Sequence, residues 1–149
     1  MIKTTQLLDG TPIPVLGIGT WEIGGDRNPD YSRDDETTET LRQIIEMGYR
    51  HIDTAEMYAA GHAEELIGRA IQSLNRVDLF ITSKVWRTNL RTADVHKALD
   101  ASLQRLGVDY LDLYLIHWPN SRYPIDRDLS GTQCSGRRWT RTTLGGEQF

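Results

Sequence analysis

The sequence predicts an α/β fold with a parallel sheet, because short apolar runs alternate with amphipathic segments over residues 1–126. Three of the apolar runs end on Asp53, Lys84 and His117, which are 31 and 33 positions apart. That spacing fits one strand plus one returning helix, the repeating unit of a parallel sheet. We therefore expect the ends of successive strands to lie side by side.

The chain is expected to begin with a β-hairpin. Asp9-Gly10 lies between the extended runs 6–8 and 11–13, and an Asp-Gly pair in that setting is typical of a tight hairpin turn. Residues 15–19 then predict a short buried strand. Residues 24–34 are rich in Gly, Asp, Asn and Pro and predict a loop.

Three helices and three further strands are predicted after this loop. The helices are expected at 35–47, 63–74 and 93–106. The further strands are expected at 49–54, 79–84 and 111–117. Met47 is included in the apolar face of the first helix, and Thr92 is expected to cap the third. Gly48 and Gly107 are suited to end the first and the third helix, respectively.

Two architectures satisfy this alternation, a doubly wound sheet and a (β/α) barrel. A doubly wound nucleotide-binding sheet would carry Gly-x-Gly-x-x-Gly between its first strand and its first helix. Residues 17–22 have the first two glycines but lack the third, and no helix follows at once. The sequence therefore disfavours a Rossmann nucleotide site.

Composition narrows the possible partners and setting. The 149 residues carry a formal net charge of −4, which gives no electrostatic reason to expect nucleic acid or an anionic membrane as a partner. No apolar run approaches the roughly 18 residues of a spanning helix, and the N-terminus lacks the apolar stretch of a signal peptide. The single cysteine, Cys134, excludes an intrachain disulfide and favours a reducing, cytoplasmic location.

Four polar side chains could meet at one edge of the predicted sheet. In a parallel barrel the C-terminal strand ends converge on the face that holds the active site. Asp53, Lys84 and His117 lie at such ends, and Tyr58 follows in the loop after Asp53. Taken singly, each is more often a surface ion pair, a packed ring or a structural histidine. Four of them at consecutive strand ends are much less easily explained by chance.

The chemistry of these four side chains is coherent. A free tyrosine has a pKa of about 10, and a nearby ammonium lowers the pKa of a phenol because it favours the phenolate. A carboxylate would hold the lysine charged, and a histidine could orient a substrate carbonyl. The set predicts a general acid for carbonyl reduction, and the hydride would have to come from a cofactor.

Four segments resemble the motifs of the aldo-keto reductases, in that family's order and spacing. They are Gly17-Ile18-Gly19-Thr20-Trp21, His51-Ile52-Asp53-Thr54-Ala55-Glu56-Met57-Tyr58, Ile81-Thr82-Ser83-Lys84-Val85-Trp86 and Leu115-Ile116-His117-Trp118-Pro119. The resemblance covers roughly residues 5–126 and implies a (β/α)8 TIM barrel of the α/β class, of which only the first four β/α units would be present after the hairpin. It also implies an NADPH-dependent oxidoreductase that reduces aldehydes and ketones to alcohols, with NADH left open.

The resemblance assigns a role to each site residue. Tyr58 would donate the proton, and Lys84 and Asp53 would adjust the pKa of its hydroxyl. His117 would position the carbonyl of a small-molecule substrate. The expected cofactor contacts are Gly19, Thr20 and Asp53. The expected substrate-pocket aromatics are Trp21, Trp86 and Trp118, although each could equally be core packing. No metal is expected, and the sequence does not identify the carbonyl substrate.

The composition changes after residue 126. Residues 127–149 hold four arginines against one aspartate and one glutamate, and their apolar residues follow neither the helical nor the strand period. This tail is expected to be disordered or mistranslated. With the reading frame moved forward by one base, codons for Gly131 to Trp139 can encode Ala-Leu-Asn-Ala-Leu-Val-Asp-Asp-Gly. Codons for Gly145 to Phe149 can encode Gly-Val-Ser-Asn-Phe, the family's fifth-strand motif, which predicts a frameshift near codons 126–127.

Three hypotheses follow. The chain is a truncated reductase with weak or no activity, a non-catalytic half barrel that binds or associates with itself, or the non-functional product of a damaged gene. Because Tyr58 and Lys84 are both present, the sequence favours enzymatic ancestry. The open edges of a half barrel predict marginal stability or self-association.

Overall fold

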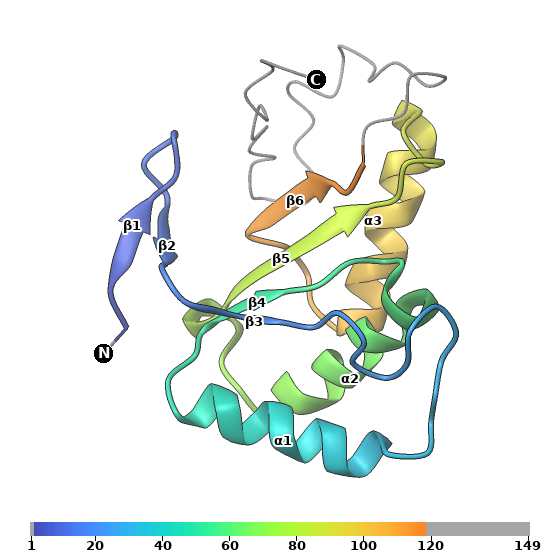
Figure 1. Ribbon diagram of the computed structural model, residues 1–149. Helices are drawn as coiled ribbons and strands as arrows, with labels where there is room; N and C mark the ends of the chain where they lie inside the picture. Colours follow the sequence, from blue (N-terminus) through green and yellow to red (C-terminus); the bar gives the residue numbers. More distant parts are fainter. Residues whose placement is uncertain (1, 119–149) are drawn as a thin grey trace.

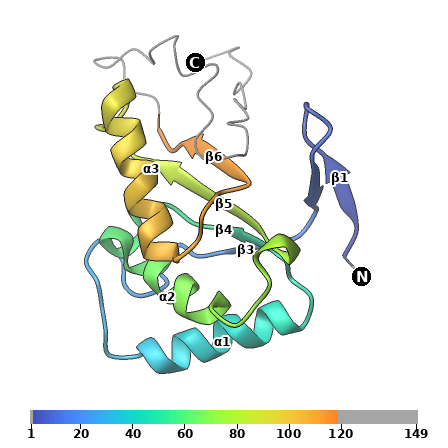
Figure 2. The same cartoon turned by 180° about the vertical axis from the view of Figure 1, so that it is seen from behind.

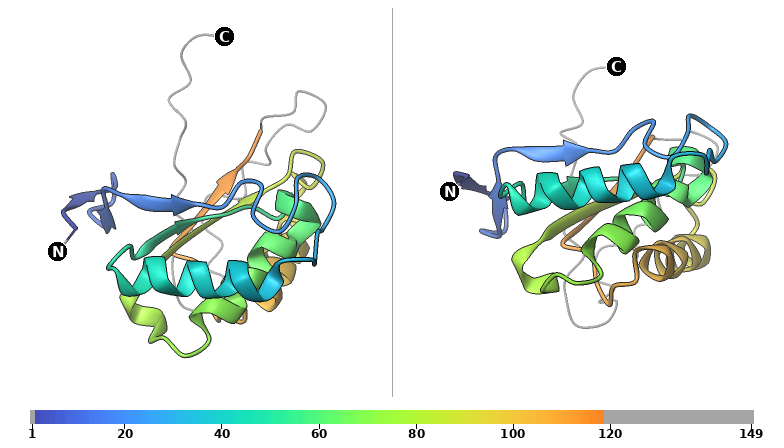
Figure 3. Two further views of the ribbon diagram at one scale, coloured as in Figure 1. Left: turned by 60° about the horizontal axis from the view of Figure 1, so that its bottom comes forward. Right: turned by 90° about the horizontal axis from the view of Figure 1, so that it is seen from below.

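A computed structural model describes residues 2–118, so the predictions made for the tail and for Cys134 lie outside the described residues. Four parallel strands form one sheet, in the order β3-β4-β5-β6, and the helices cover one side of it (Figures 1 and 3). The strands are β3 (Gly17–Gly19), β4 (His51–Asp53), β5 (Phe80–Val85) and β6 (Leu113–Ile116). The helices are α1 (Asp34–Glu46), α2 (His62–Ile71) and α3 (Thr92–Leu106). The predicted alternation of strands and helices is confirmed.

The strand register brings the predicted strand ends to one edge of the sheet. Asp53 pairs with Thr82 of β5, and Lys84 pairs with Leu115 of β6. His117 follows the last residue of β6, and its backbone N–H donates to the carbonyl of Val85 over 3.0 Å. Because all four strands run in the same direction, Asp53, Lys84 and His117 lie at the same C-terminal edge.

The core lies between the sheet and the helices. Figure 2, seen from behind, shows α3 alongside β5 and β6, while α1 and α2 lie below β3 and β4. One apolar cluster joins the inner faces of α1 and α2 to the middle of the sheet; its central members are Leu41, Ile45, Ile52, Leu66, Ile67 and Ile81. Positive φ angles at Gly48 (106°) and Gly107 (65°) terminate α1 and α3, as expected.

The predicted hairpin is confirmed as β1 (Thr4–Gln6) and β2 (Pro12–Pro14), which pair antiparallel. Gly10 in the turn has a φ of 84°, and the backbone N–H of Thr11 donates to Oδ1 of Asp9 over 2.9 Å. In Figure 1 the hairpin lies apart from the four-stranded sheet, beside the start of β3.

Several local predictions are wrong. Val15 and Leu16 are more than half exposed, because they lie in the segment between β2 and β3 and β3 begins only at Gly17. Met47 is exposed because it is the C-cap of α1, one residue beyond the buried face. Thr92 is the first residue of α3 and not its cap; Arg91 occupies the cap position.

The second predicted helix also differs from the structure. It ends at Ile71 rather than near Leu74, and a short 3-10 helix, η2 (Arg76–Asp78), leads into β5. Within residues 2–118 no helix is long and apolar enough to cross a membrane.

Candidate active site

Lys84 is the centre of the polar cluster at the C-terminal edge of the sheet. Its Nζ atom lies 2.8 Å from Oδ1 of Asp53, 2.8 Å from the carbonyl oxygen of Thr54 and 3.3 Å from the hydroxyl oxygen of Tyr58. An ammonium group has three N–H donors. The three acceptors therefore account for all of its hydrogens and fix its direction.

The contact with Lys84 determines where the hydroxyl hydrogen of Tyr58 can point. The hydroxyl oxygen of Tyr58 accepts a hydrogen bond from Lys84, and the ring itself is buried. Because the lysine supplies the hydrogen of that bond, the hydroxyl hydrogen of Tyr58 must point elsewhere. It is available to a further acceptor, such as a carbonyl oxygen.

His117 completes the cluster from the last strand. The centroid of its ring is 5.4 Å from that of Tyr58 and 5.4 Å from that of Trp86, both in edge-on contacts. Burial lowers the pKa of His117 below its ordinary value of 6.5, and the positive charge of Lys84 lowers it further, whereas Asp53 opposes both effects. The ring is therefore neutral at neutral pH. Its Nδ1 atom is buried and has no hydrogen-bond partner among the described residues.

The backbone after Tyr58 has an unusual conformation. Ala59, Ala60 and Gly61 have φ angles of 47°, 53° and 96°, all in the left-handed region. For an L-residue this conformation costs roughly 1–2 kcal/mol, and such strain clusters at functional sites. The Ala59 N–H donates to the carbonyl of Asp26 over 3.0 Å. The loop between β3 and α1 thus holds the strained segment, which the sequence did not reveal.

The residues predicted to contact a cofactor differ in accessibility. Thr20 is fully buried, and both its backbone N–H and its Oγ1 hydroxyl donate to the carbonyl of Asp53 over 3.1 Å. This leaves the Asp53 side chain, which is 41% exposed, free to reach Lys84 and a ligand. A Cβ added to Gly19 would meet nothing within 4 Å. Gly19 therefore borders open space at the same edge of the sheet.

The three tryptophans lie around the cluster. The Trp21 ring is 5.1 Å from that of Tyr58 in an edge-on contact, and Trp86 contacts His117. Trp21 is 48% exposed and Trp118 is 58% exposed, so neither belongs to the core of the described residues. Their role as pocket aromatics stays a prediction.

Sequence reasoning missed Glu56, which fixes the loop after β5. Its Oε1 atom accepts hydrogen bonds from the backbone N–H of Trp86, over 2.5 Å, and from Nδ2 of Asn89, over 3.1 Å. The Glu56 carboxylate thereby holds Trp86 against His117. In the sequence, Glu56 stands out only because it lies between Asp53 and Tyr58. That position does not reveal its contacts with Trp86 and Asn89.

Sequence reasoning also missed Glu64, a fully buried carboxylate on α2. The Ser83 hydroxyl donates to its Oε1 over 2.6 Å, and the Arg105 Nε donates to its Oε2 over 2.7 Å. The helical period places position 64 on the same face as Ile67 and Ile71, which was a usable signal. This network ties α2 to β5 and α3 directly behind Lys84.

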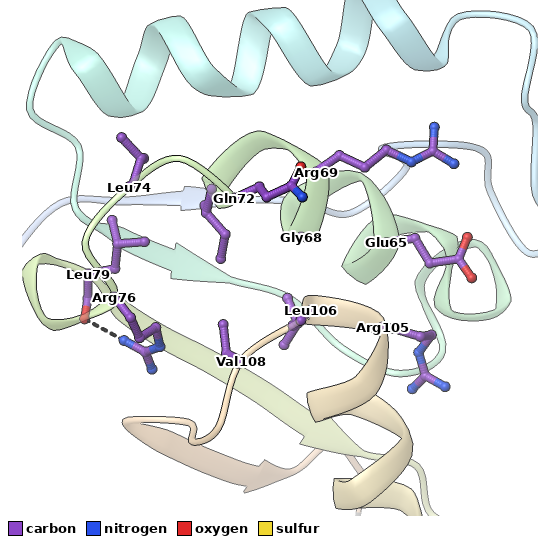
Figure 4. A pocket seen from close by; sticks show the side chains of 12 residues that line it. Glu65, Gly68, Arg69, Gln72, Leu74, Arg76, Leu79, Arg105, Leu106 and Val108 are labelled. Atoms are coloured by element: carbon purple, nitrogen blue, oxygen red, sulfur yellow. Dashed lines mark hydrogen bonds between the residues drawn. The ribbon is translucent and has the colours of Figure 1, made fainter.

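A separate hollow of about 600 Å³ lies between α2 and the end of α3 (Figure 4). Its three arginines are Arg69, Arg76 and Arg105, and each is paired with a carboxylate, that of Asp34, Asp112 and Glu64, respectively. The lining contains none of the residues around Lys84. This hollow is not part of the candidate active site.

Comparison with known proteins agrees with the predicted motifs. Residues 15–132 match the sequence model of the Aldo/keto reductase family. An aldehyde reductase of Saccharomyces cerevisiae is 44% identical over 118 residues, an alignment that covers 78% of this chain and 33% of that protein. A methylglyoxal reductase of Escherichia coli is 43% identical over 119 residues, covering 80% of this chain and 40% of that protein.

Solved structures show the same fold. A thermostable aldo-keto reductase crystallised with the inhibitor epalrestat has a TM-score of 0.80 and 56% identity, over 83% of this chain and 45% of that one. An aldo-keto reductase of Klebsiella pneumoniae in complex with NADPH has a TM-score of 0.71 and 38% identity, over 87% and 42%. The predicted (β/α)8 architecture is confirmed for the part of the barrel that these residues form. The chain spans roughly a third to two fifths of the curated relatives' length, and it belongs to the aldo/keto reductase family.

Proposed function

We propose that the cluster of Asp53, Tyr58, Lys84 and His117 donates the proton in an NADPH-dependent reduction of an aldehyde or ketone to an alcohol. One observation carries the proposal: the three N–H groups of Lys84 are directed to Asp53, Thr54 and Tyr58. This arrangement leaves the Tyr58 hydrogen free for a substrate oxygen.

The chemistry follows from these contacts. Reduced nicotinamide, when bound, supplies the hydride that is added to the carbonyl carbon. The carbonyl oxygen gains negative charge, and Tyr58 transfers its hydroxyl proton to that oxygen, which becomes the alcohol. The charge left on the Tyr58 oxygen lies 3.3 Å from the Lys84 ammonium. At that separation the attraction amounts to about 1 kcal/mol in water and about 5 kcal/mol at an effective dielectric constant of about 20.

The other side chains hold this geometry. Asp53 keeps the ammonium of Lys84 in place, and the neutral ring of His117 can hydrogen-bond the carbonyl oxygen without bringing a second positive charge to the site. Gly19 and the exposed carboxylate of Asp53 would face the nicotinamide nucleotide, because both border open space at this edge. The open space beside Gly19 and Asp53 therefore suits a nicotinamide nucleotide.

The relatives support the same activity. One of them is named an aldehyde reductase and another a methylglyoxal reductase, and one solved neighbour is a complex with NADPH. Because this chain spans only part of their length, we expect weak or no repeated turnover from the 149 residues alone, and the test therefore follows a single turnover. Use of NADH, a cytoplasmic location and association of two copies through the sheet edges stay predictions.

The test is single-turnover oxidation of NADPH, with protein in excess and a simple aldehyde as substrate. We expect slow oxidation that depends on the aldehyde and is lost in Tyr58→Phe, which keeps the ring and removes the donor. Tyr49→Phe is the matched control, since Tyr49 precedes β4 at the opposite end of the strand from Asp53. Oxidation that is equal in Tyr58→Phe and the wild type, or that never depends on the aldehyde, would contradict the proposal.

A further inference from the structure

His62 has two acidic partners and no part in the chemistry proposed above. It is the first residue of α2, four positions after Tyr58, and it is 2% exposed. Its Nδ1 lies 2.9 Å from Oε2 of Glu65, and its Nε2 lies 2.8 Å from Oδ1 of Asp34. Asp34 is the first residue of α1. A single buried imidazole therefore joins the starts of two helices.

The loop between β3 and α1, residues 20–33, is folded around this imidazole. The Tyr31 ring lies 4.4 Å from that of His62. A Cβ on Gly24 would come within 2.8 Å of the His62 ring, so only glycine allows the loop to approach this closely. The His62 side chain thus contacts the loop at Gly24 and Tyr31 and, through Asp34, at its end.

The same loop also contacts the segment that carries Tyr58. Trp21 at its start packs edge-on against the Tyr58 ring, at 5.1 Å. The carbonyl of Asp26 accepts the backbone N–H of Ala59, the first left-handed residue after Tyr58. The loop that His62 contacts is therefore the same loop that contacts Tyr58 and Ala59.

Both ring nitrogens of His62 face a carboxylate. Ionised carboxylates only accept hydrogen bonds, so both ring nitrogens can bond to Asp34 and Glu65 only when both carry hydrogen. Arg69 also faces Asp34, at 2.9 Å, and satisfies its second oxygen. Asp30, in the same loop, also interacts electrostatically with His62. Loss of the ring proton would leave a nitrogen lone pair facing a carboxylate and break one of the two bonds.

We propose that His62 is a positioning residue for Tyr58, which it holds through the β3–α1 loop by bridging Asp34 and Glu65 as an imidazolium. The importance of Tyr58 rests on the proposed function, but the clamp itself does not depend on turnover. The proposal predicts that the loop contacts at Trp21 and Ala59 weaken when His62 loses its proton. A residue that only fills space would not produce this pH dependence.

The experiment is an NMR pH titration of the full chain, combined with amide hydrogen exchange. The signals to follow are the His62 ring, the Trp21 indole N–H and the Ala59 amide. The His117 ring is followed separately. In the wild type, the Trp21 and Ala59 signals should move with the same midpoint as the His62 ring. In His62→Gln that midpoint should vanish from both signals, and Ala59 exchange should accelerate about tenfold or more, while Ile81 in the core is unchanged.

His96→Gln, on α3, should leave the Trp21 and Ala59 titrations as in the wild type. If His62→Gln does not fold, Asp34→Asn removes one carboxylate while keeping its size and should also accelerate Ala59 exchange. Trp21 and Ala59 signals that do not follow the His62 titration, or unchanged Ala59 exchange in the folded variant, would overturn the proposal. Neither readout involves NADPH oxidation, so a failure here is distinct from a failure of the proposed function.

Discussion

Replacing Glu64 by alanine tests how much the buried network of Glu64, Ser83 and Arg105 contributes to stability. Glu64 is fully buried, and the Arg105 side chain that binds it is 23% exposed. The two side chains approach to 2.7 Å, and the Ser83 hydroxyl lies 2.6 Å from the other carboxylate oxygen. Glu64→Ala removes the charge that Arg105 compensates and leaves the Ser83 hydroxyl without its acceptor.

The expected loss follows from these distances and burials. Removing one partner of a buried ion pair costs about 3–5 kcal/mol, because the other charge stays desolvated. Arg105 can partly turn to water, so the lower end of this range applies to its charge. A buried hydroxyl that loses its acceptor adds about 1 kcal/mol or more. We expect Glu64→Ala to lose about 3–5 kcal/mol in total, a large part of the 5–15 kcal/mol typical of a folded domain.

The assay is urea unfolding followed by circular dichroism, with Glu39→Ala as the matched control. Glu39 pairs with Arg42 at 2.6 Å, almost the same distance, but its side chain is 51% exposed. A solvent-exposed pair contributes about 0–1 kcal/mol, so the control should lose less than about 1 kcal/mol. If the two variants lose the same free energy of unfolding, burial of the carboxylate is not what makes the Glu64 network important.

Three further predictions concern packing, pH and ligand access. Gly68→Ala should lose about 1–3 kcal/mol in the same unfolding assay, because its Cβ would come within 2.7 Å of the Arg105 carbonyl oxygen and push α2 from α3; wild-type stability would refute this contact. Burial lowers the pKa of both His51 and His117 below 6.5, so the unfolded chain takes up protons first and stability should fall as the pH drops through about 6.5 and below. Replacing both by Gln should flatten this dependence, and an unchanged slope would contradict the assignment. Gly19→Ala should unfold like the wild type but bind NADPH more weakly by fluorescence titration, since its Cβ meets only open space; equal affinity would remove Gly19 from the cofactor site.

The strand ends could be predicted because their signal is local and repeats along the chain. Asp53, Lys84 and His117 each follow an apolar run, and parallel strands bring such ends to one edge. The contact between Tyr58 and Lys84 followed from the same logic. The exposure of Val15 and Leu16 could not be predicted, because a short apolar run does not show at which residue its strand begins.

Other features depend on partners that are distant in sequence. The left-handed backbone at Ala59 and Ala60 is set by a hydrogen bond to Asp26, 33 positions before Ala59, and alanine gives no local sign of it. Likewise, His62 is 28 positions from Asp34, and no short motif connects the two residues. Sequence patterns located the groups that we propose react, whereas the contacts that position them required the folded structure.

The central claim is that the Lys84 ammonium directs the Tyr58 hydroxyl toward a substrate carbonyl. The most direct measurement is the rate of aldehyde-dependent NADPH oxidation in a single turnover by Lys84→Met, compared with Lys97→Met. Lys97 is an exposed lysine on α3 with only a distant pairing to Asp94, at 3.8 Å. We expect a wild-type rate for Lys97→Met and, from the loss of about 1–5 kcal/mol of attraction, a fall of about fivefold to more than a thousandfold for Lys84→Met. Equal rates in the two variants would show that the ammonium does not act on Tyr58.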